Sequence, residues 1–436
     1  MNAKTLTTLL SLCPAFLLSI AHAADRRLVQ EPAYPQHICS TLTPEPGNNQ
    51  QRIQQAIERC PAGQAVKLIA ANGHNTFLSG PLSMRSGTWL WVDKGAVLAA
   101  SANPADYDKV NGMCGTLSNQ KGQCQPFIHI DNAQGGGIVG EGTIDGGGNQ
   151  IMEGKTETWW QLARRAQKEG GNQNVPRLIQ VDNAKNLTFY HIRLTNSPNF
   201  HLVLNKVQGI TVWGIVIDTP ADARNTDGID PGAATDVTIA KSVIRTGDDN
   251  IAIKAGNSGP TRFISIVDNH FYSGHGMSLG SETNSGISDI LIKDLTLDGT
   301  TSGIRIKSDS SRGGIVENVH VENVCLRNNK WPITLDTAYE GKKGNLIPWY
   351  KHISLKNVSG NSGKVVLNGY DSEHPLDVTF DAVKIDNLQG WHQQNAIVRV
   401  AEGGLTPTPS TIANATAVKT AYACEGKWLP FPAMRQ

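Results

Sequence analysis

The chain of 436 residues has almost no net charge and few aromatic side chains. Its 39 Lys and Arg residues balance 38 Asp and Glu residues, which gives a formal net charge of +1. Such a chain has no global field that would attract a nucleic acid or an anionic membrane, so we expect neither partner and look for local ionic recognition. Aromatic residues make up 6% of the chain whereas 44 residues are glycine, and this balance favours tight turns over helical bundles.

Long apolar runs are confined to the first residues. Lys4 supplies a short positive region, Leu9 to Ile20 form an apolar stretch, and Ala21-His22-Ala23 is a small-residue cleavage signal. This pattern predicts a secretory signal peptide over residues 1–23, cleaved near Ala23, and a secreted protein, extracellular or periplasmic. No later run approaches the length of about 18 apolar residues that a membrane span requires, so we expect a soluble protein. The moderate charge and the lack of an obvious apolar surface stripe favour a monomer.

The sequence has no Cys-x-x-Cys motif and no His pair at zinc-ligand spacing. Cleavage would remove Cys13 and leave an even number of cysteines, which in an exported chain favours disulfides over a metal site. The short spacings predict Cys39–Cys60 and Cys114–Cys124, and Cys325–Cys424 remains by elimination. We expect neither a metal nor a cofactor.

Short strand-like segments recur through the second half of the chain. They begin at residues 187, 210, 237, 264, 290 and 319, and fainter copies begin at 353 and 378. The β-branched, alternating pattern excludes helical repeats, and the period is too short for a propeller blade of about 40 residues. Three short strands and three turns fit each period. The sequence therefore predicts one all-β domain over residues 24–436, a right-handed parallel β-helix.

A coil of this kind has open ends that must be covered. Residues 48–60 place Ile53, Ala56, Ile57 and Cys60 on one helical face, which predicts a short N-terminal capping helix. We expect the tail after about residue 400 to cover the other end. Trp159-Trp160 and the following residues 163–171 are expected to form a loop over a groove.

Acidic residues recur with the same period. When the apolar residues Ile229, Ile251, Met277 and Ile304 are aligned, the positions two residues earlier are Asp227, Asp249, His275 and Ser302. Because equivalent positions stack about 4.8 Å apart in such a coil, three carboxylates and a histidine meet in one patch, with Asp248 beside Asp249. Strict alternation would point these side chains inward, so we expect them in the turn before each strand.

Cations face the same patch. Ile304 and Ile306 point inward, so Arg305 and Lys307 point outward beside the carboxylates, and Lys254 shares a column with Lys307. Close carboxylates raise at least one pKa, which supplies a protonated acid beside an ionised base, as glycoside hydrolysis requires. Arginine can grip a carboxylate in bidentate fashion, so an acidic sugar suits the site.

Four short motifs in this order resemble glycoside hydrolase family 28, the polygalacturonases. They are Asn225-Thr226-Asp227, Gly247-Asp248-Asp249, Gly274-His275-Gly276 and Arg305-Ile306-Lys307. The resemblance extends from about residue 138 to Tyr339. It implies hydrolysis of α-1,4 bonds between galacturonates of pectin with inversion. Exo attack requires a loop that closes one end of the groove, and because the sequence shows no large insertion around residues 255–300, endo attack is favoured.

The resemblance also implies the residue roles. Asp248 would be the general acid, Asp227 and Asp249 would position and deprotonate the attacking water, and His275 would control the protonation of the acid or contact the sugar. An inverting site predicts an acid about 6.5–9.5 Å from the base pair. The remaining candidates would bind the substrate carboxylates or line the site. They are Arg305, Lys307, Asn225, Tyr339 and Lys254, the last because it shares a column with Lys307.

Three other functions remain open from the sequence. One is a hydrolase of the same family acting on rhamnogalacturonan or xylogalacturonan. The intact Gly-His-Gly and Arg-Ile-Lys disfavour the rhamnogalacturonan hydrolase, in which this pattern is expected to be altered. Another is a calcium-dependent pectate lyase, which the paired acid and water-binding carboxylates disfavour. A non-enzymatic polysaccharide-binding adhesin would need no acid cluster. The acidic cluster could also bind calcium, but the cations Arg305 and Lys307 oppose it.

Overall fold

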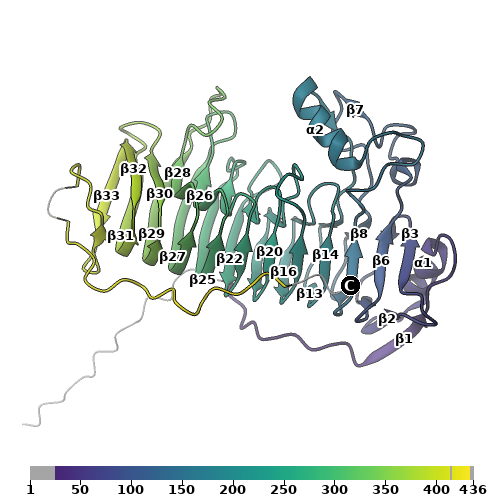
Figure 1. Cartoon of the computed structure of the whole chain (residues 1–436). Helices are drawn as coiled ribbons and strands as arrows, with labels where there is room; N and C mark the ends of the chain where they lie inside the picture. Colours follow the sequence, from purple (N-terminus) through teal and green to yellow (C-terminus); the bar gives the residue numbers. More distant parts are fainter. Residues whose placement is uncertain (1–24, 413–414, 433–436) are drawn as a thin grey trace, which may run out of the picture.

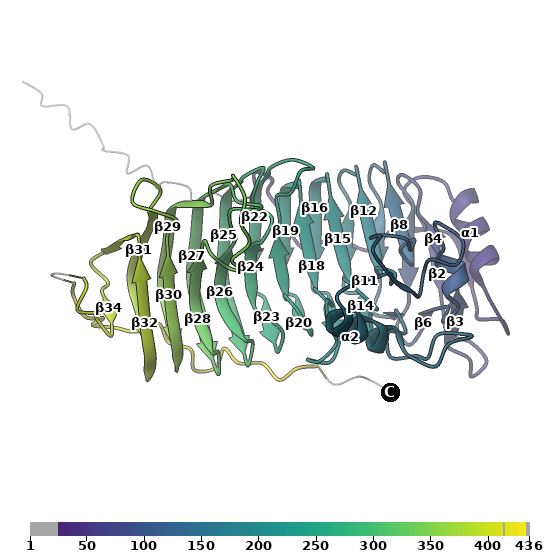
Figure 2. The ribbon, with the colours of Figure 1, turned by 90° about the horizontal axis from the view of Figure 1, so that it is seen from above.

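The computed structural model describes residues 25–412 and 415–432, and the predicted signal peptide with Cys13 lies outside this range. The chain winds into one long coil whose successive turns lie side by side, from α1 at one end to β33 at the other (Figures 1 and 2). Nearly every strand pairs in parallel with the strand one turn away. The predicted right-handed parallel β-helix is confirmed. Among the described residues, no helix is long and apolar enough to cross a membrane.

Two large parallel sheets form the walls of the coil. One of them has 11 strands. Its strands are β4 (Leu82–Ser83), β8 (Ile128–Asp131), β12 (Ile179–Asp182), β15 (Leu202–Asn205), β18 (Ile229–Gly232), β21 (Ile251–Ile253), β24 (Met277–Gly280), β26 (Ser302–Lys307), β28 (Trp331–Asp336), β30 (Gly363–Asn368) and β32 (Leu388–Gln394).

The 21-stranded sheet bends along its length and supplies the other two walls. One row contains β1 (His37–Leu42), β2 (Gln64–Leu68), β5 (Trp89–Val92), β9 (Gly137–Val139), β13 (Thr188–Tyr190), β16 (Gln208–Trp213), β19 (Thr235–Ala240), β22 (Thr261–Val267) and β33 (Ala396–Val400). The other contains β3 (Thr76–Ser79), β6 (Val97–Ala100), β10 (Thr143–Asp145), β14 (Arg193–Thr195), β17 (Val216–Asp218), β20 (Val243–Arg245), β23 (His270–Tyr272) and β34 (Leu405–Thr406). Four long strands belong to both rows, β25 (Ile287–Asp298), β27 (Ile315–Arg327), β29 (Trp349–Gly360) and β31 (Leu376–Ile385).

The predicted repeat coincides with the strand register. The aligned starts pair residue by residue from turn to turn, as Ile210 with Val237, Val237 with Ile264 and Ile264 with Ile290. The same column continues to Val319, Ile353 and Val378. These side chains are all almost completely buried, so the column is a ladder of stacked aliphatic residues in the core. Burying each of these side chains stabilises the fold by about 2 kcal/mol, so a shift of any turn by one residue, which would move them out of the core, is costly.

Asparagine and aspartate occupy the bends between the two rows of the large sheet. Asp294, Asn323 and Asn357 all have a positive φ, which these residues tolerate better than other side chains do. Asn323 donates a hydrogen bond to Asp294 at 2.9 Å, and Asn357 donates one to Asn323 at 3.0 Å. The side chains that shape the bend therefore also link adjacent turns.

Helix α1 (Gln50–Arg59) covers the first turn, as predicted. Ile53 and Ile57 are buried against the core, Ala56 is partly buried, and Cys60 is tied to β1 by the disulfide Cys39–Cys60. The exposed face of the helix is polar. The helix therefore closes this end of the coil by burying the apolar stripe that the sequence shows.

The expected position of the tail is correct only in part. β33 and β34 extend the last turns of the large sheet, but the chain then runs back along the coil (Figure 1). The disulfide Cys325–Cys424 fixes it to β27, and the Arg327 guanidinium lies 4.2 Å from the centroid of Trp428. Its far end reaches Phe431, whose ring lies 4.1 Å from the Arg245 guanidinium. These contacts lie on the strands and not on the open end, so the tail also straps the turns together.

The expected loop at Trp159 is wrong: residues Trp159–Glu169 form helix α2 above the 11-stranded sheet (Figure 2). Thr158 and Gln161 form a capping box, and Gly170 ends the helix in the left-handed conformation. Trp159 is buried and packs edge-on against Tyr107 of the short 3₁₀ helix Pro104–Tyr107. The sequence of this segment contains both a capping box and an apolar helical stripe, and both indicate a helix. The helix leads into β11 (Asn172–Gln173), which pairs with β7 (Leu117–Ser118) outside the coil.

Candidate active site

Three consecutive turns before strands of the 11-stranded sheet hold the predicted patch. Register pairs Ile229 with Ile251, Ile251 with Met277, and Met277 with Ile304, as the sequence alignment predicted. The strands β18, β21 and β24 begin at the first three of these residues, so Asp227, Asp249 and His275 lie in the preceding turns. The predicted exception to strict alternation is confirmed. Gly276 has a φ of +87° and a Cβ there would lie 2.1 Å from the carbonyl oxygen of Ser302, so this turn requires glycine.

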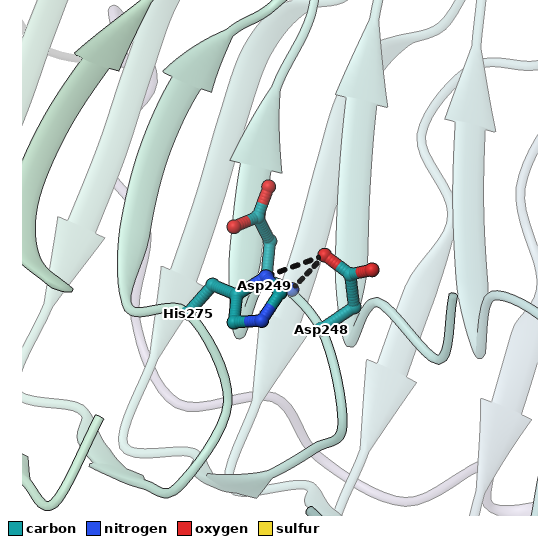
Figure 3. A group of neighbouring side chains, drawn as sticks. All are labelled: Asp248, Asp249 and His275. Carbon is teal, nitrogen blue, oxygen red and sulfur yellow. Dashed lines mark hydrogen bonds and ion pairs between the residues drawn. The ribbon is translucent and has the colours of Figure 1, made fainter. Parts of the chain in front are cut away.

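Asp248 is the most accessible of the three carboxylates, with 19% of its side chain exposed. Its Oδ1 accepts hydrogen bonds from Nδ1 of His275 and from the backbone N–H of Asp249, both at 2.9 Å (Figure 3). Its Oδ2 accepts a longer bond of 3.4 Å from Nδ2 of Asn225. One carboxyl group is thus oriented by three predicted site residues, and part of it faces solvent.

Asp249 is held by the two predicted cations. Lys307 Nζ lies 2.7 Å from Asp249 Oδ2, and the Arg305 guanidinium binds Asp249 Oδ1. Ser278 donates to the same Oδ1 at 2.9 Å and accepts a bond of 2.9 Å from Arg305 Nε. All of these side chains are nearly buried. Both oxygens of Asp249 are therefore engaged in charge-assisted hydrogen bonds.

Asp227 has a different environment. Its Oδ2 lies 3.4 Å from Lys254 Nζ, which lies closer, at 2.8 Å, to Oδ2 of Asp230. Its Oδ1 is buried without a hydrogen-bond partner among the described residues. The backbone carbonyl of Asp227 accepts a hydrogen bond of 2.9 Å from Nδ1 of His201, a buried ring whose pKa burial lowers to about 4. One ammonium group is thus shared between two buried carboxylates.

The two remaining predicted residues border the patch. Asn225 adopts a positive φ of 54° and links Asp248 to Gln173, which donates to Asn225 Oδ1 at 3.3 Å. Tyr339 lies on the opposite side, with its ring centroid 5.1 Å from Lys307 Nζ and 5.7 Å from the Arg305 guanidinium. All nine predicted catalytic and binding residues therefore lie at or beside one patch of the sheet.

The electrostatics separate the three carboxyl groups. Burial raises the pKa of Asp227 well above its usual value, and the neighbouring Asp230 and Asp248 raise it further. Burial also acts on Asp249, but Arg305 and Lys307 outweigh it and lower the pKa of that carboxyl. In Asp248 burial raises the pKa, but the hydrogen bond and charge of His275 together with the charge of Lys307 outweigh it, so the pKa of this carboxyl is lowered. One pKa is raised as expected, but the group is Asp227 and not Asp248.

The expected separation of the carboxyl groups is not found for Asp248 and Asp249. Oxygens of these two side chains lie within 4.8 Å of each other, below the range of about 6.5–9.5 Å expected for an inverting pair. The two aspartates are adjacent in the sequence and share one tight turn, so their side chains cannot move far apart.

Asp248, Asp249 and His275 are also the described residues that could offer three ligand atoms to a metal. Both oxygens of Asp249, however, already accept hydrogen bonds from cationic side chains. A divalent cation would have to displace or repel Arg305 and Lys307. The arrangement fits an anionic group near these cations better than a metal ion.

Several contributors were missed in the sequence. Asp230 and Ser278 could have been found from the alternation of the strands. Each follows the inward residue of its strand and therefore points outward, as Arg305 does, and Ser278 pairs with Arg305 in register. Gln173 could not have been found in this way, because it reaches the site from outside the repeat, where Arg224, the neighbour of Asn225 in the sequence, donates to it at 2.6 Å. Phe200, which lies 4.4 Å from Lys254 Nζ, precedes its strand without any repeat signal.

The chain is similar in sequence to known proteins. Residues 89–403 match the family described as glycosyl hydrolases family 28. The chain is 44% identical over 382 residues to an endo-polygalacturonase of Pectobacterium carotovorum subsp. carotovorum, covering 87% of this chain and 94% of the relative. It is 42% identical to a polygalacturonase of Ralstonia solanacearum, covering 87% and 85% of the two chains.

A solved structure agrees with these sequence matches. The polygalacturonase from Erwinia carotovora ssp. carotovora superimposes with a TM-score of 0.84 at 43% identity, covering 86% of this chain and all of that one. The family match spans well over half of the sequence and includes every predicted site residue. The chain therefore belongs to family 28 of the glycosyl hydrolases.

Proposed function

We propose that this protein is a secreted polygalacturonase, which hydrolyses α-1,4 bonds between galacturonate residues of pectin from within the chain. The observation that carries the proposal is the buried pair Arg305 and Lys307 beside an accessible Asp248. A uronate carboxylate near these cations would place the glycosidic oxygen by the acid. The names of the relatives at 44% and 42% identity support the substrate, and the first is an endo enzyme.

Asp248 is the proposed general acid, since it is the carboxyl group that a glycosidic oxygen can reach. In the free protein His275 lowers its pKa, so it must gain its proton when substrate binds. An anionic sugar and the exclusion of water both disfavour the charged form of a carboxyl group and raise its pKa. His275, hydrogen-bonded to Asp248, is the proposed proton partner. The proton then passes from Asp248 to the leaving oxygen as the C1–O bond breaks.

Asp227 and Asp249 are proposed to position the attacking water. Asp249 is a poor nucleophile because two cations bind its oxygens, but it can still orient a water molecule. The unpartnered Oδ1 of Asp227 can accept the proton of that water once Asp227 is ionised. Direct attack by water inverts the anomeric carbon, whereas a covalent intermediate would retain it. Arg305, Lys307, Asn225, Tyr339 and Lys254 are the proposed substrate contacts.

Secretion and the monomeric state are part of the proposal. The predicted leader over residues 1–23 supports export, and so do three disulfides, which form in oxidising compartments. We propose that the active protein is residues 24–436, acting without a metal or cofactor on extracellular polygalacturonate.

The first experiment incubates the protein with polygalacturonate and a chelator while reducing ends and the ultraviolet absorbance of unsaturated uronides are followed together. Hydrolysis yields reducing ends without new absorbance. Absorbance that disappears with chelator would identify a calcium-dependent lyase and overturn the proposal. A protein that binds the polymer and produces neither signal would be a binding protein instead.

The second experiment tests the roles. Asp248→Asn is expected to lose about 10²–10⁴-fold in kcat, the usual contribution of a general acid. A substrate with a good leaving group, such as an aryl galacturonide oligomer, needs less protonation and should recover much of this loss. Asp131→Asn, which changes an exposed carboxylate of the same sheet, is the matched control and should remain within about twofold. If Asp227→Asn were rescued by the leaving group and Asp248→Asn were not, the acid would be Asp227.

A further inference from the structure

A strongly cationic cleft opens next to the catalytic patch, toward the N-terminal turns of the coil. Its volume is about 560 Å³, and Asn225 and Lys254 of the patch also line it. Of its charged lining residues, one is acidic, Glu282, and the others are cationic. These cations are Lys109, Lys121, Arg177, Arg224 and Lys254. The imbalance contrasts with the near-neutral chain as a whole, so the charge is concentrated at this place.

Most of these cations lack a counter-ion. Within residues 25–412 and 415–432, no carboxylate oxygen lies within 4.0 Å of the side-chain nitrogens of Lys109, Lys121, Arg177 or Arg224. Arg177 and Arg224 instead donate to neutral amides, Arg177 to Gln180 at 2.9 Å and Arg224 to Gln173 at 2.6 Å. Burial lowers the pKa of Arg224, the effect expected for a guanidinium whose charge is not neutralised. Repulsion among unpaired cations is relieved when an anion binds between them.

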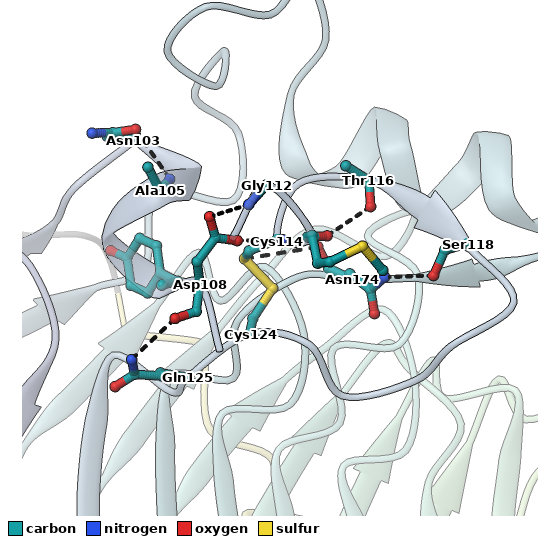
Figure 4. Close-up of a disulfide and its surroundings, with 12 residues drawn as sticks. Asn103, Ala105, Asp108, Gly112, Cys114, Thr116, Ser118, Cys124, Gln125 and Asn174 are labelled. Carbon is teal, nitrogen blue, oxygen red and sulfur yellow. Dashed lines mark hydrogen bonds between the residues drawn. A yellow bond between two sulfur atoms is a disulfide. The ribbon is translucent and has the colours of Figure 1, made fainter. Parts of the chain in front are cut away.

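The wall that carries the two lysines is held in place. Lys121 lies in the loop closed by the disulfide Cys114–Cys124, and Lys109, which precedes this loop, donates its backbone N–H to the carbonyl oxygen of Gln123 at 3.0 Å. Asp108 accepts hydrogen bonds of 2.7 Å from the backbone N–H groups of Gly112 and Cys114 (Figure 4). The pairing of β7 with β11 joins this loop to Gln173, which contacts Asn225. A continuous set of contacts therefore links the lysine loop to the catalytic turn.

The floor of the cleft suits a sugar ring. The aromatic ring of Phe200 lies 4.4 Å from Lys254 Nζ and 5.4 Å from the Arg177 guanidinium, so an apolar face stands between two cations. A pyranose can place its apolar face on an aromatic ring while its carboxylate meets a cation beside it. An inorganic anion could bind the cations but has no apolar face that would pack on the ring of Phe200.

We infer that this cleft binds unesterified uronate residues of the substrate beyond those at the scissile bond, with Lys109 and Lys121 as specificity-determining contacts. The inference rests on the proposed function, because it takes the occupant to be the same polymer. Lys109 and Lys121 then favour long, de-esterified chains, since short oligomers do not extend to the loop and methyl esters carry no charge to bind.

The test uses the full-length mature protein and compares kcat/KM for short and long oligogalacturonides at constant, low ionic strength. The double variant Lys109→Ala/Lys121→Ala is expected to lower kcat/KM for long oligomers about fivefold, which is the effect of losing two solvent-exposed ion pairs. Its kcat/KM for the shortest cleavable oligomer should stay within about twofold of the wild type. The preference of the wild type for de-esterified over methyl-esterified polymer should shrink by a similar factor. Higher salt should reduce the difference between variant and wild type.

Two controls isolate the charge at this place. Lys109→Arg/Lys121→Arg keeps the charge and should behave as the wild type. Lys185→Ala/Lys419→Ala removes two exposed lysines outside the cleft and should leave the length dependence unchanged. If the cleft variant matched the wild type on long oligomers while Asp248→Asn was inactive, the inference would be wrong and the proposed function would stand. If Asp248→Asn kept full activity, the proposed function itself would fail, whatever the lysine variants did.

Discussion

Lys307 Nζ lies 2.7 Å from Oδ2 of Asp249, and both side chains are almost completely buried. Each charge depends on the other, because removing one partner of a buried ion pair leaves the second uncompensated. This pair, with Arg305 on the other oxygen, sets the pKa of Asp249 below its usual value. In the proposed function the same two cations bind the carboxylate of an acidic sugar.

Lys307→Met is expected to destabilise the protein by about 3 kcal/mol at pH 7 and to lower kcat/KM by about 10²-fold or more. Urea denaturation and initial rates on polygalacturonate measure the two effects. The double variant Lys307→Met/Asp249→Asn also lacks the uncompensated carboxylate, so it should regain stability but no activity. Lys356→Met, which changes an exposed lysine, is the control and should stay within about 0.5 kcal/mol. A single variant as stable as the wild type would contradict the buried-pair interpretation.

Asp227→Asn is expected to abolish activity while making the protein more stable at pH 7. The pKa of Asp227 is raised in the folded protein, so the folded state holds a proton that the unfolded state releases above a pKa of about 3.9. The stabilisation from this group is present below that value and is lost as the pH rises through the folded pKa. The gain over wild type, about 1–2 kcal/mol, should therefore appear at pH 7 and vanish near pH 4. Equal stability differences at both pH values would show that the group does not titrate abnormally.

Asp182 is expected to contribute to stability with the opposite pH dependence. Burial raises its pKa, but hydrogen bonds from His129, Asn205 and Gln180 outweigh burial and lower the pKa to about 2. The unfolded state then binds more protons between pH 4 and 2, so this contribution is present above about pH 4 and is lost as the pH falls through 2. Asp182→Asn should cost about 1 kcal/mol at pH 6 and less at pH 2.5, in urea denaturation curves, because solvent weakens a half-exposed pair. The same loss at both pH values would mean that packing, not charge, is responsible.

Loss of the disulfide Cys325–Cys424 is expected to lower stability without removing activity at 25 °C. The bond closes a segment of 99 residues, which corresponds to as much as about 4.7 kcal/mol of chain entropy. The tail contacts strands of the large sheet through Trp428 and Phe431 and touches none of the catalytic side chains described above. Cys325→Ala/Cys424→Ala should lower the melting temperature, and assays below the transition should stay within about twofold of wild type. A strong loss of kcat in a fully folded variant would show that the C-terminal tail affects the catalytic turn.

Much of the fold was predictable because the repeat is local and regular. The aliphatic column through Val237, Ile264 and Ile290 is visible as a spacing, and parallel pairing converts that spacing into register. The same logic predicted that Asp227, Asp249 and His275 meet. It failed at α2, where a capping box at Thr158 was overlooked, and in the tail, whose return along the coil depends on a disulfide partner far away in the sequence.

Features outside the repeat could not be placed from spacing. Gln173 reaches Arg224 and Asn225 from β11, which pairs with β7 in the loop closed by Cys114–Cys124, and it occupies no position of the repeat. The cationic cleft has a similar origin, because Lys109, Lys121, Arg177 and Arg224 lie in segments between strands, whereas Lys254 follows the register of the repeat. Such contacts arise from how excursions fold back onto the coil, which depends on packing and disulfide bonding.

The sequence by itself determined that Asp227 and Asp249 occupy equivalent positions in consecutive turns, because each stands two residues before a core isoleucine of the register. Only the tertiary structure decided that their pKa values shift in opposite directions. Asp249 faces two cations of its own, whereas Asp227 shares a single ammonium group with Asp230 in a buried site. The repeat sets where a backbone lies, but the charge state of a side chain depends on the neighbours that other turns bring to it.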